Sequence, residues 1–135
     1  MSPKKILLAE DDRDDQKIFH EFLKHRADIS LILYVENGED LLQSLDLITD
    51  TNLLPDLIIL DQNMPKKNGL QTLQALKQDS RYKHLPVVVY STYTDQRLID
   101  NASAMGAAKV TSKPFNRSGY NKMVDELLEL IGDRV

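Results

Sequence analysis

The chain contains no cysteine among its 135 residues. Disulfide bonds, thiolate metal sites and cysteine nucleophiles are therefore excluded. A long apolar run near the start is also missing, because residues 6–9 soon meet the acidic stretch Glu10, Asp11 and Asp12. This pattern is neither a signal peptide nor a membrane span. We therefore expect a cytoplasmic protein without membrane contact.

An excess of positive charge is missing as well. Lysine and arginine together number 17, against 21 aspartate and glutamate residues, so the formal net charge is −4. Nucleic-acid binders normally show a clustered basic face, and direct binding to nucleic acid is not expected. A chain of 135 residues is long enough for one well-packed domain and short for two. The sequence therefore predicts a single domain over residues 1–135.

Short apolar runs alternate with helical patterns along the whole chain. The predicted strands cover residues 6–9, 29–35, 57–60, 87–90 and 107–112. Apolar stripes with helical spacing fall within residues 18–23, 41–48, 70–76, 98–105 and 120–131. This alternation, without a long linker or a repeat, predicts one doubly wound α/β domain with a parallel sheet.

Polar side chains follow four of these strands. Glu10 and Asp11 come after the first strand, Asp61 after the third, Ser91 after the fourth and Lys113 after the fifth. The carboxyl ends of parallel strands lie at one edge of the sheet, which is where such folds bind ligands. We therefore expect three carboxylates, one hydroxyl and one amine to face a shared crevice.

This set of groups favours phosphoryl chemistry. Clustered carboxylates repel one another unless a proton or a cation neutralises them. Their oxygen ligands suit a hard cation, and Mg²⁺ is favoured because few ligands leave room for waters. Beside that ion, Lys113 and Ser91 are suited to share the oxygens of a phosphoryl group. Asp61 is then the nucleophile that accepts it.

With these motifs in place, the sequence resembles the receiver domain of two-component response regulators over essentially its whole length. The matching residues are Glu10-Asp11, Asp61 with Asn63-Met64-Pro65 and Gly69, Ser91-Thr92, and Lys113-Pro114-Phe115. Each motif alone is weak, but all of them in this order are specific. The resemblance implies a CheY-like, flavodoxin-like (βα)5 fold with strand order 2-1-3-4-5.

The resemblance also implies a role for each acid at the sheet edge. Asp61 is the phosphoacceptor, Asp11 binds Mg²⁺ directly, and Glu10 binds it through water. The backbone carbonyl of Asn63 completes the protein's share of the metal ligands. Asn63 and Tyr93 flank the water that hydrolyses the phosphoryl group.

The remaining implied roles concern the phosphoryl group itself. Lys113 holds one of its oxygens, and the bond from Lys113 to Pro114 is expected to be cis. Ser91 is the switch hydroxyl, which moves inward and brings the following loop with it. The amide of Thr92 donates to the same group.

One departure from the family pattern lies in the fifth strand. Many receivers carry an aromatic residue there that turns inward with the switch hydroxyl, but this chain has Val110. The output signal is then expected from the loop after the fourth strand, or from Tyr90 or Tyr93.

Several other polar residues have a simpler interpretation. Asp12, Asp14 and Asp15 are predicted to cap the first helix and to form its solvated face. The three histidines show no metal-binding spacing and are predicted to lie at the surface: His20, His25 and His84.

The function implied is that of a phosphorylation-activated response regulator. Its expected partners are a sensor histidine kinase and a downstream protein or histidine phosphotransfer partner, and homodimerisation stays open. No output domain is expected, because only residues 132–135 follow the last helix. No enzymatic activity is expected beyond assistance to its own phosphotransfer and autodephosphorylation. Residues 76–92 resemble regulators that work with phytochrome-type or related sensor kinases.

Three other functions compete with this one. A receiver-like module that interacts without phosphorylation would keep the fold alone. An aspartyl-phosphate phosphohydrolase would carry a second aspartate two residues after the nucleophile, where this chain has Asn63. A flavodoxin-like mononucleotide binder would carry a Ser-, Thr- or Gly-rich loop after the first strand, where this chain is acidic.

Overall fold

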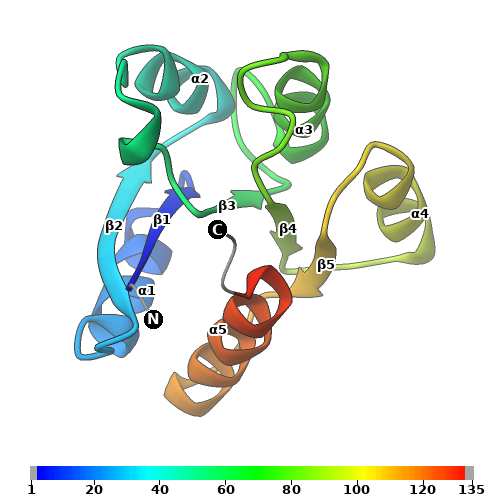
Figure 1. Ribbon diagram of the computed structural model, residues 1–135. Coiled ribbons are helices and arrows are strands. Elements are labelled where there is room, and N and C mark those ends of the chain that lie inside the picture. The colour runs from blue at the N-terminus through cyan, green and yellow to red at the C-terminus, as the bar shows by residue number, and fades with distance from the viewer. Residues whose placement is uncertain (1–2, 133–135) are drawn as a thin grey trace.

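The computed structural model describes residues 3–132, apart from the side chain of Leu31. A parallel sheet lies at the centre, with helices on both faces (Figure 1). The strands are β1 (Lys4–Ala9), β2 (Ile29–Val35), β3 (Leu57–Asp61), β4 (Val87–Ser91) and β5 (Lys109–Ser112). The helices are α1 (Arg13–Leu23), α2 (Gly38–Asp46), the short 3₁₀ helix η1 (Thr51–Leu53), α3 (Gly69–Gln78), α4 (Gln96–Ala104) and α5 (Arg117–Ile131).

The sheet has the order β2-β1-β3-β4-β5, and every neighbouring pair is parallel. This order confirms the predicted doubly wound α/β fold. None of the helices within residues 3–132 combines the length and the apolar character that a membrane span requires. The expectations that drew on residues 1–2 and 133–135 concern parts of the chain outside the described residues.

The two faces of the sheet build two separate cores. Successive strand residues point to opposite faces, and in β4 this sends Val89 to the side of α2, α3 and α4. Tyr90, the next residue, packs on the side of α1 and α5. Figure 1 shows α1 and α5 together on one side of the sheet and the other helices opposite them. The long apolar runs of the inner strands follow from burial on both faces.

Local signals set the helix ends. The side chain of Asp12 accepts hydrogen bonds from the backbone N–H groups of Asp14 and Asp15, which confirms Asp12 as the cap of α1. Gly106, with a φ of 100°, provides the left-handed residue that ends α4. The fifth strand begins at residue 109 rather than 107, because the N–H of Ala107 bonds to a carbonyl at the end of α4.

Arg26, just after α1, ties that helix to α5. Its guanidinium pairs with Asp28 at 2.7 Å and with Asp125 at 2.6 Å. It also donates to the Asn121 side chain at 3.1 Å. This cluster holds α1 and α5 together on one face of the sheet.

We expect Arg26→Ala to lower the free energy of unfolding by about 1–3 kcal/mol, because hydrogen bonds to charged groups contribute this much when partly buried. Urea denaturation of both proteins measures the difference. Arg13→Ala is the matched control: its ion pair with Glu36 is exposed, and its removal should change stability by less than about 0.5 kcal/mol. Equal losses in the two variants would contradict a stabilising role specific to Arg26.

Candidate functional site

The register of the strands places Glu10, Asp61 and Tyr90 at the same level of the sheet. Ala9 pairs with Leu60, and Asp61 pairs with Tyr90. Glu10 follows Ala9, so it stands level with Asp61 at the carboxyl ends of β1 and β3. This level of the sheet lies where parallel sheets bind ligands.

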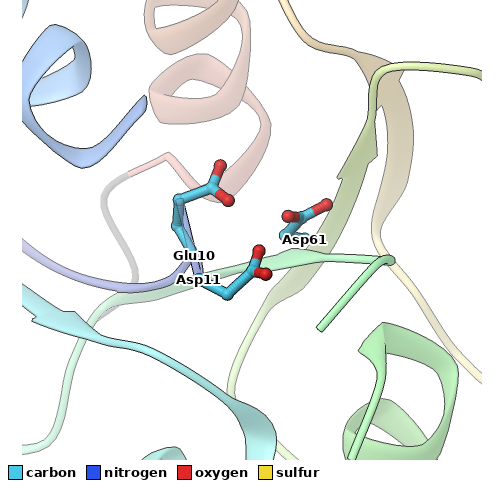
Figure 2. Close-up of side chains that lie close together, drawn as sticks. All are labelled: Glu10, Asp11 and Asp61. Carbon is cyan, nitrogen blue, oxygen red and sulfur yellow. The ribbon is translucent and has the colours of Figure 1, made fainter. Parts of the chain in front are cut away.

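The acids predicted from the sequence do meet. Glu10, Asp11 and Asp61 each offer one carboxylate oxygen, and these oxygens lie within 4.8 Å of one another. Figure 2 shows the three carboxylates gathered between the ends of β1 and β3. We call this group the acidic cluster. Glu10 and Asp61 are buried while Asp11 is exposed, so the cluster is open toward solvent on the Asp11 side.

The donor set of the acidic cluster fits a divalent cation. All three groups are hard oxygen ligands, and such ligands suit Mg²⁺, Mn²⁺ and Ca²⁺ rather than softer metals. The exposed position of Asp11 leaves room for the waters that Mg²⁺ usually keeps. The residues present therefore satisfy what a metal site of this kind needs.

Lys113 supplies the positive charge among these acids. Its ammonium lies 2.8 Å from Glu10 Oε1, 3.2 Å from Asp61 Oδ2 and 3.2 Å from Asp15 Oδ2. The lysine side chain is 11% exposed. One largely buried ammonium thus links the ends of β1 and β3 to helix α1.

The surroundings push the ionisation of the two buried acids in opposite directions. Burial, and then the neighbouring Glu10, raises the pKa of Asp61 to about 7. Burial also works to raise the pKa of Glu10, but hydrogen bonds with Asp61, Lys113 and Tyr90 outweigh it and hold that pKa below its usual value. Without a cation, Asp61 therefore keeps its proton to a higher pH than Glu10 does.

Lys113 stays charged throughout. Burial works to lower its pKa, but the carboxylates of Glu10 and Asp61 raise that pKa above its usual value.

The loop after β3 holds Asp61 in place. The backbone N–H of Asn63 donates to Asp61 Oδ1 at 3.2 Å. Gly69 allows this loop to fold back, because a Cβ there would lie 2.8 Å from the backbone oxygen of Asp61. The motif that follows Asp61 in the sequence therefore shapes the surroundings of its carboxylate.

The loop after β4 carries the other predicted residues. Ser91 is buried and its hydroxyl accepts a hydrogen bond from the N–H of Tyr93 at 3.4 Å. Thr92 is exposed. Within the described residues, no hydrogen bond joins the side chain of either residue to the acidic cluster. A hollow of about 410 Å³, lined by Asn63, Ser91, Tyr93 and residues of α4, separates this loop from α3 and α4. We call it the β4–α4 hollow.

Two contacts at the site were missed by the sequence interpretation. Asp15 was assigned to the solvated face of the first helix, but it is half-buried and pairs with Lys113. Its spacing of one helical turn from the cap Asp12 was an available signal. Tyr90 was considered as an output residue, yet it is fully buried and its hydroxyl donates to Glu10.

Two further expectations have a clear outcome. The bond before Pro114 is not cis, because the described residues contain no cis peptide bond; the trans form is also intrinsically preferred by about 0.5–1 kcal/mol. His20, His25 and His84 are exposed, as predicted. Val110 is half-buried and packs on the side of α4.

The fold and the site together define a class of protein: a doubly wound α/β domain that gathers acids around one lysine at the carboxyl edge of its sheet. A family model described as the response regulator receiver domain matches residues 6–125. The chain therefore belongs to the response regulator receiver domain family of two-component systems.

Several known proteins similar to this chain are response regulators. The chemotaxis protein CheY1 of Helicobacter pylori is 28% identical over 94% of this chain and 95% of its own length. The crystal structure of the phosphorylated cyanobacterial phytochrome response regulator RcpA is 31% identical, with 95% of this chain and 93% of that chain covered and a TM-score of 0.81. The Mn²⁺-bound form of response regulator Rcp1 is 29% identical, with 98% and 97% covered and a TM-score of 0.79. Other curated relatives are longer: the chain spans 33% to 46% of their length.

The raised pKa of Asp61 predicts a pH-dependent effect of Asp61→Asn on stability in the presence of a chelator. The folded-state pKa, about 7, lies above the ordinary value of 3.8. The protonated carboxyl group therefore favours folding at low pH, and this contribution is lost as the pH rises through 7. Asparagine has no proton to lose. Between about pH 5 and about pH 8, the variant should gain about 1–3 kcal/mol relative to the wild type.

Urea denaturation at the two pH values measures this gain. Asp14→Asn, at an exposed position of α1, is the control and should show no comparable pH dependence. A stability difference between Asp61→Asn and the wild type that stays constant with pH would rule out the raised pKa.

Proposed function

We propose that this receiver domain is a phosphorylation-activated switch in which Asp61 accepts a phosphoryl group from a sensor histidine kinase. The observation that carries the proposal is the position of Lys113, whose ammonium lies 3.2 Å from Asp61 and 2.8 Å from Glu10. A phosphoryl group on Asp61 would place its oxygens beside this ammonium, and charge-assisted hydrogen bonds of this kind are among the strongest in proteins.

The transfer balances as a displacement at phosphorus. An Asp61 carboxylate oxygen forms the new P–O bond while the P–N bond to the kinase histidine breaks. The imidazole nitrogen keeps the bonding electron pair and takes up a proton. Asp61 must be ionised to attack, and its hydrogen bond from the N–H of Asn63 fixes one oxygen so that the other is presented to the donor.

Mg²⁺ is the cation that we assign to the acidic cluster. Asp11 and Asp61 would bind it directly, Glu10 through water, and the backbone carbonyl of Asn63 would complete the set. When bound, a divalent cation supplies the positive charge that allows the clustered carboxylates to be ionised together. That the similar response regulator Rcp1 has a Mn²⁺-bound form supports a divalent cation as a ligand of this domain.

The β4–α4 hollow supports a switch movement in the loop after β4. Ser91 borders this hollow, and its hydroxyl would move toward the phosphoryl oxygens while the N–H of Thr92 donates to them. The loop and Tyr93 would then change position, which is the order and packing change typical of such switches. Tyr90 is already buried, so Tyr93 and the loop are left as the elements that carry the output.

The partners follow from this function. We assign a sensor histidine kinase as the phosphodonor and a downstream protein or histidine phosphotransfer partner as the receiver of the signal. The name of the similar phytochrome response regulator RcpA supports a kinase of the phytochrome type. We further propose that the domain acts in the cytoplasm and without direct contact to nucleic acid. Homodimerisation would be a further means of signalling.

We assign no turnover of external substrates. Asn63 stands two residues after Asp61, where an aspartyl-phosphate phosphohydrolase carries its acid/base aspartate. An amide cannot transfer a proton in that role, so activity is limited to the domain's own phosphotransfer and autodephosphorylation.

We expect the protein to gain one phosphoryl mass when it is incubated with Mg²⁺ and a small phosphodonor, and Asp61→Asn to abolish the gain. Intact-protein mass spectrometry measures the label. Asp14→Asn, an exposed aspartate on α1, is the control and should be labelled like the wild type. Labelling that survives Asp61→Asn would contradict the assigned phosphoacceptor. A wild type that takes no label from either a small donor or a kinase would favour the phosphorylation-independent interaction module.

We expect Tyr93→Ala to shorten the lifetime of the phosphorylated protein several-fold. Tyr93 is 75% exposed and lines the same hollow as Asn63 and Ser91, so its removal opens the approach of water to the phosphoryl group. The decay of labelled protein after donor removal gives the rate. Tyr34→Phe, on the distant edge strand β2, is the control. An unchanged decay in Tyr93→Ala would mean that Tyr93 does not shield the site.

A further inference from the structure

Tyr90 is a buried polar residue at the site that the proposed function does not use. It is 0% exposed and stands near the end of β4, next to Ser91 and in register with Asp61. The three residues before it in β4 are all valines. A hydroxyl therefore appears on this strand only where the strand reaches the acidic cluster.

The Tyr90 side chain crosses the row of strand ends. Its hydroxyl donates to Glu10 Oε1 at 2.6 Å, although β3 lies between β4 and β1. Its ring lies below Lys113, with the ammonium 5.0 Å from the ring centroid. Unlike the ammonium, this hydroxyl donates to Glu10 without carrying a positive charge.

Glu10 Oε1 is contacted by two donors, the Tyr90 hydroxyl and the Lys113 ammonium. Lys113 lies 2.8 Å from the same oxygen. The other oxygen, Oε2, accepts a longer hydrogen bond of 3.3 Å from the N–H of Asp12. Tyr90 and Lys113 thus hold Oε1, and Oε2 is the oxygen available to a cation in the acidic cluster.

Binding of a cation and a phosphoryl group changes this balance. A bound cation would repel Lys113 and a phosphoryl oxygen would attract it, and both effects would draw Lys113 away from Glu10. Glu10 has a side-chain exposure of 0%, and a buried carboxylate oxygen that loses its last donor is costly. The Tyr90 hydroxyl remains as the donor that Glu10 keeps.

We propose that Tyr90 is a positioning residue of the metal site: it holds Glu10 in the ligand orientation after Lys113 has moved, and thereby sets the affinity of the acidic cluster for divalent cations. The proposal rests on that part of the proposed function which assigns a divalent cation to the acidic cluster. Because Tyr90 adjoins Ser91, it also connects the strand that carries the switch hydroxyl to the metal carboxylate.

The test is a calorimetric titration of the wild type and of Tyr90→Phe with Mg²⁺, in the absence of a phosphodonor. The substitution removes the hydroxyl and keeps the ring that fills the core. We expect Mg²⁺ to bind about 10-fold more weakly than to the wild type, which is the usual effect of losing a hydrogen bond to a metal ligand. Tyr82→Phe is the matched control, since its hydroxyl donates to the Asp46 carboxylate at 2.7 Å far from the acidic cluster. It should bind Mg²⁺ like the wild type.

A double-variant comparison separates positioning from general loosening of the core. Glu10→Asp draws the carboxylate back by one methylene, out of reach of the Tyr90 hydroxyl, while it keeps the charge. In that background, Tyr90→Phe should cause no further loss of Mg²⁺ affinity. An undiminished loss there, an equal loss in Tyr82→Phe, or an unchanged affinity in Tyr90→Phe would each overturn the proposal.

The two proposals fail in different ways. A wild type that binds Mg²⁺ with the expected dependence on Tyr90 but takes no phosphoryl group would overturn the proposed function and support the role of Tyr90. A wild type that is labelled at Asp61, with a Tyr90→Phe variant of unchanged Mg²⁺ affinity, would overturn the role of Tyr90 alone.

Discussion

The contact on which the site depends is the ammonium of Lys113 held between Glu10, Asp15 and Asp61. These acids come from β1, α1 and β3, and the lysine follows β5, so one charge joins four parts of the chain. Without it, the buried carboxylates would repel one another across the carboxyl edge of the sheet. A buried ion pair contributes little net stability because both charges lose their hydration. Its value here lies in fixing where the acids stand.

The two faces of the sheet differ in how much they can change. On the side of α1 and α5, the Tyr90 hydroxyl donates to Glu10. Arg26 donates to Asp28 and Asp125 and so holds α1 to α5. On the opposite side, Ser91 borders the β4–α4 hollow. Tyr90 and Ser91 are neighbours in β4 and point to opposite faces. The end of β4 therefore contributes one residue to the hydrogen-bonded side of α1 and α5 and one to the β4–α4 hollow.

Most of the fold could be predicted from the sequence because burial on both faces of a parallel sheet leaves a visible pattern. The runs 57–60 and 87–90 are apolar for this reason, and the residues that follow them at the strand ends could be read directly as site candidates. The strand order came from the family resemblance, since alternation of strands and helices does not determine it. The boundaries of the fifth strand depended on a hydrogen bond of Ala107 to the end of α4, which has no sequence signal.

The contacts of Asp15 and Tyr90 show where prediction from the sequence stops. Both belong to patterns with an ordinary explanation, a helix start for Asp15 and a buried strand for Tyr90. Their partners depend on strand register and on the reach of long side chains: Tyr90 spans one intervening strand to meet Glu10. Sequence spacing gives the position of a backbone atom within an element, but it does not show which distant side chain a hydroxyl or a carboxylate meets.

The charges at the site explain why a proton, a lysine and a cation compete there. Glu10, Asp11, Asp15 and Asp61 carry four negative charges when all are ionised, and Lys113 carries one positive charge. The raised pKa of Asp61 favours uptake of a proton by the site, which reduces the excess from three negative charges to two. A divalent cation that replaced this proton would reduce the excess from three negative charges to one. It would also leave Asp61 ionised, as the proposed attack on phosphorus requires. Tyr90 adds no charge to this set, and it is therefore the donor that Glu10 retains whichever positive group is bound.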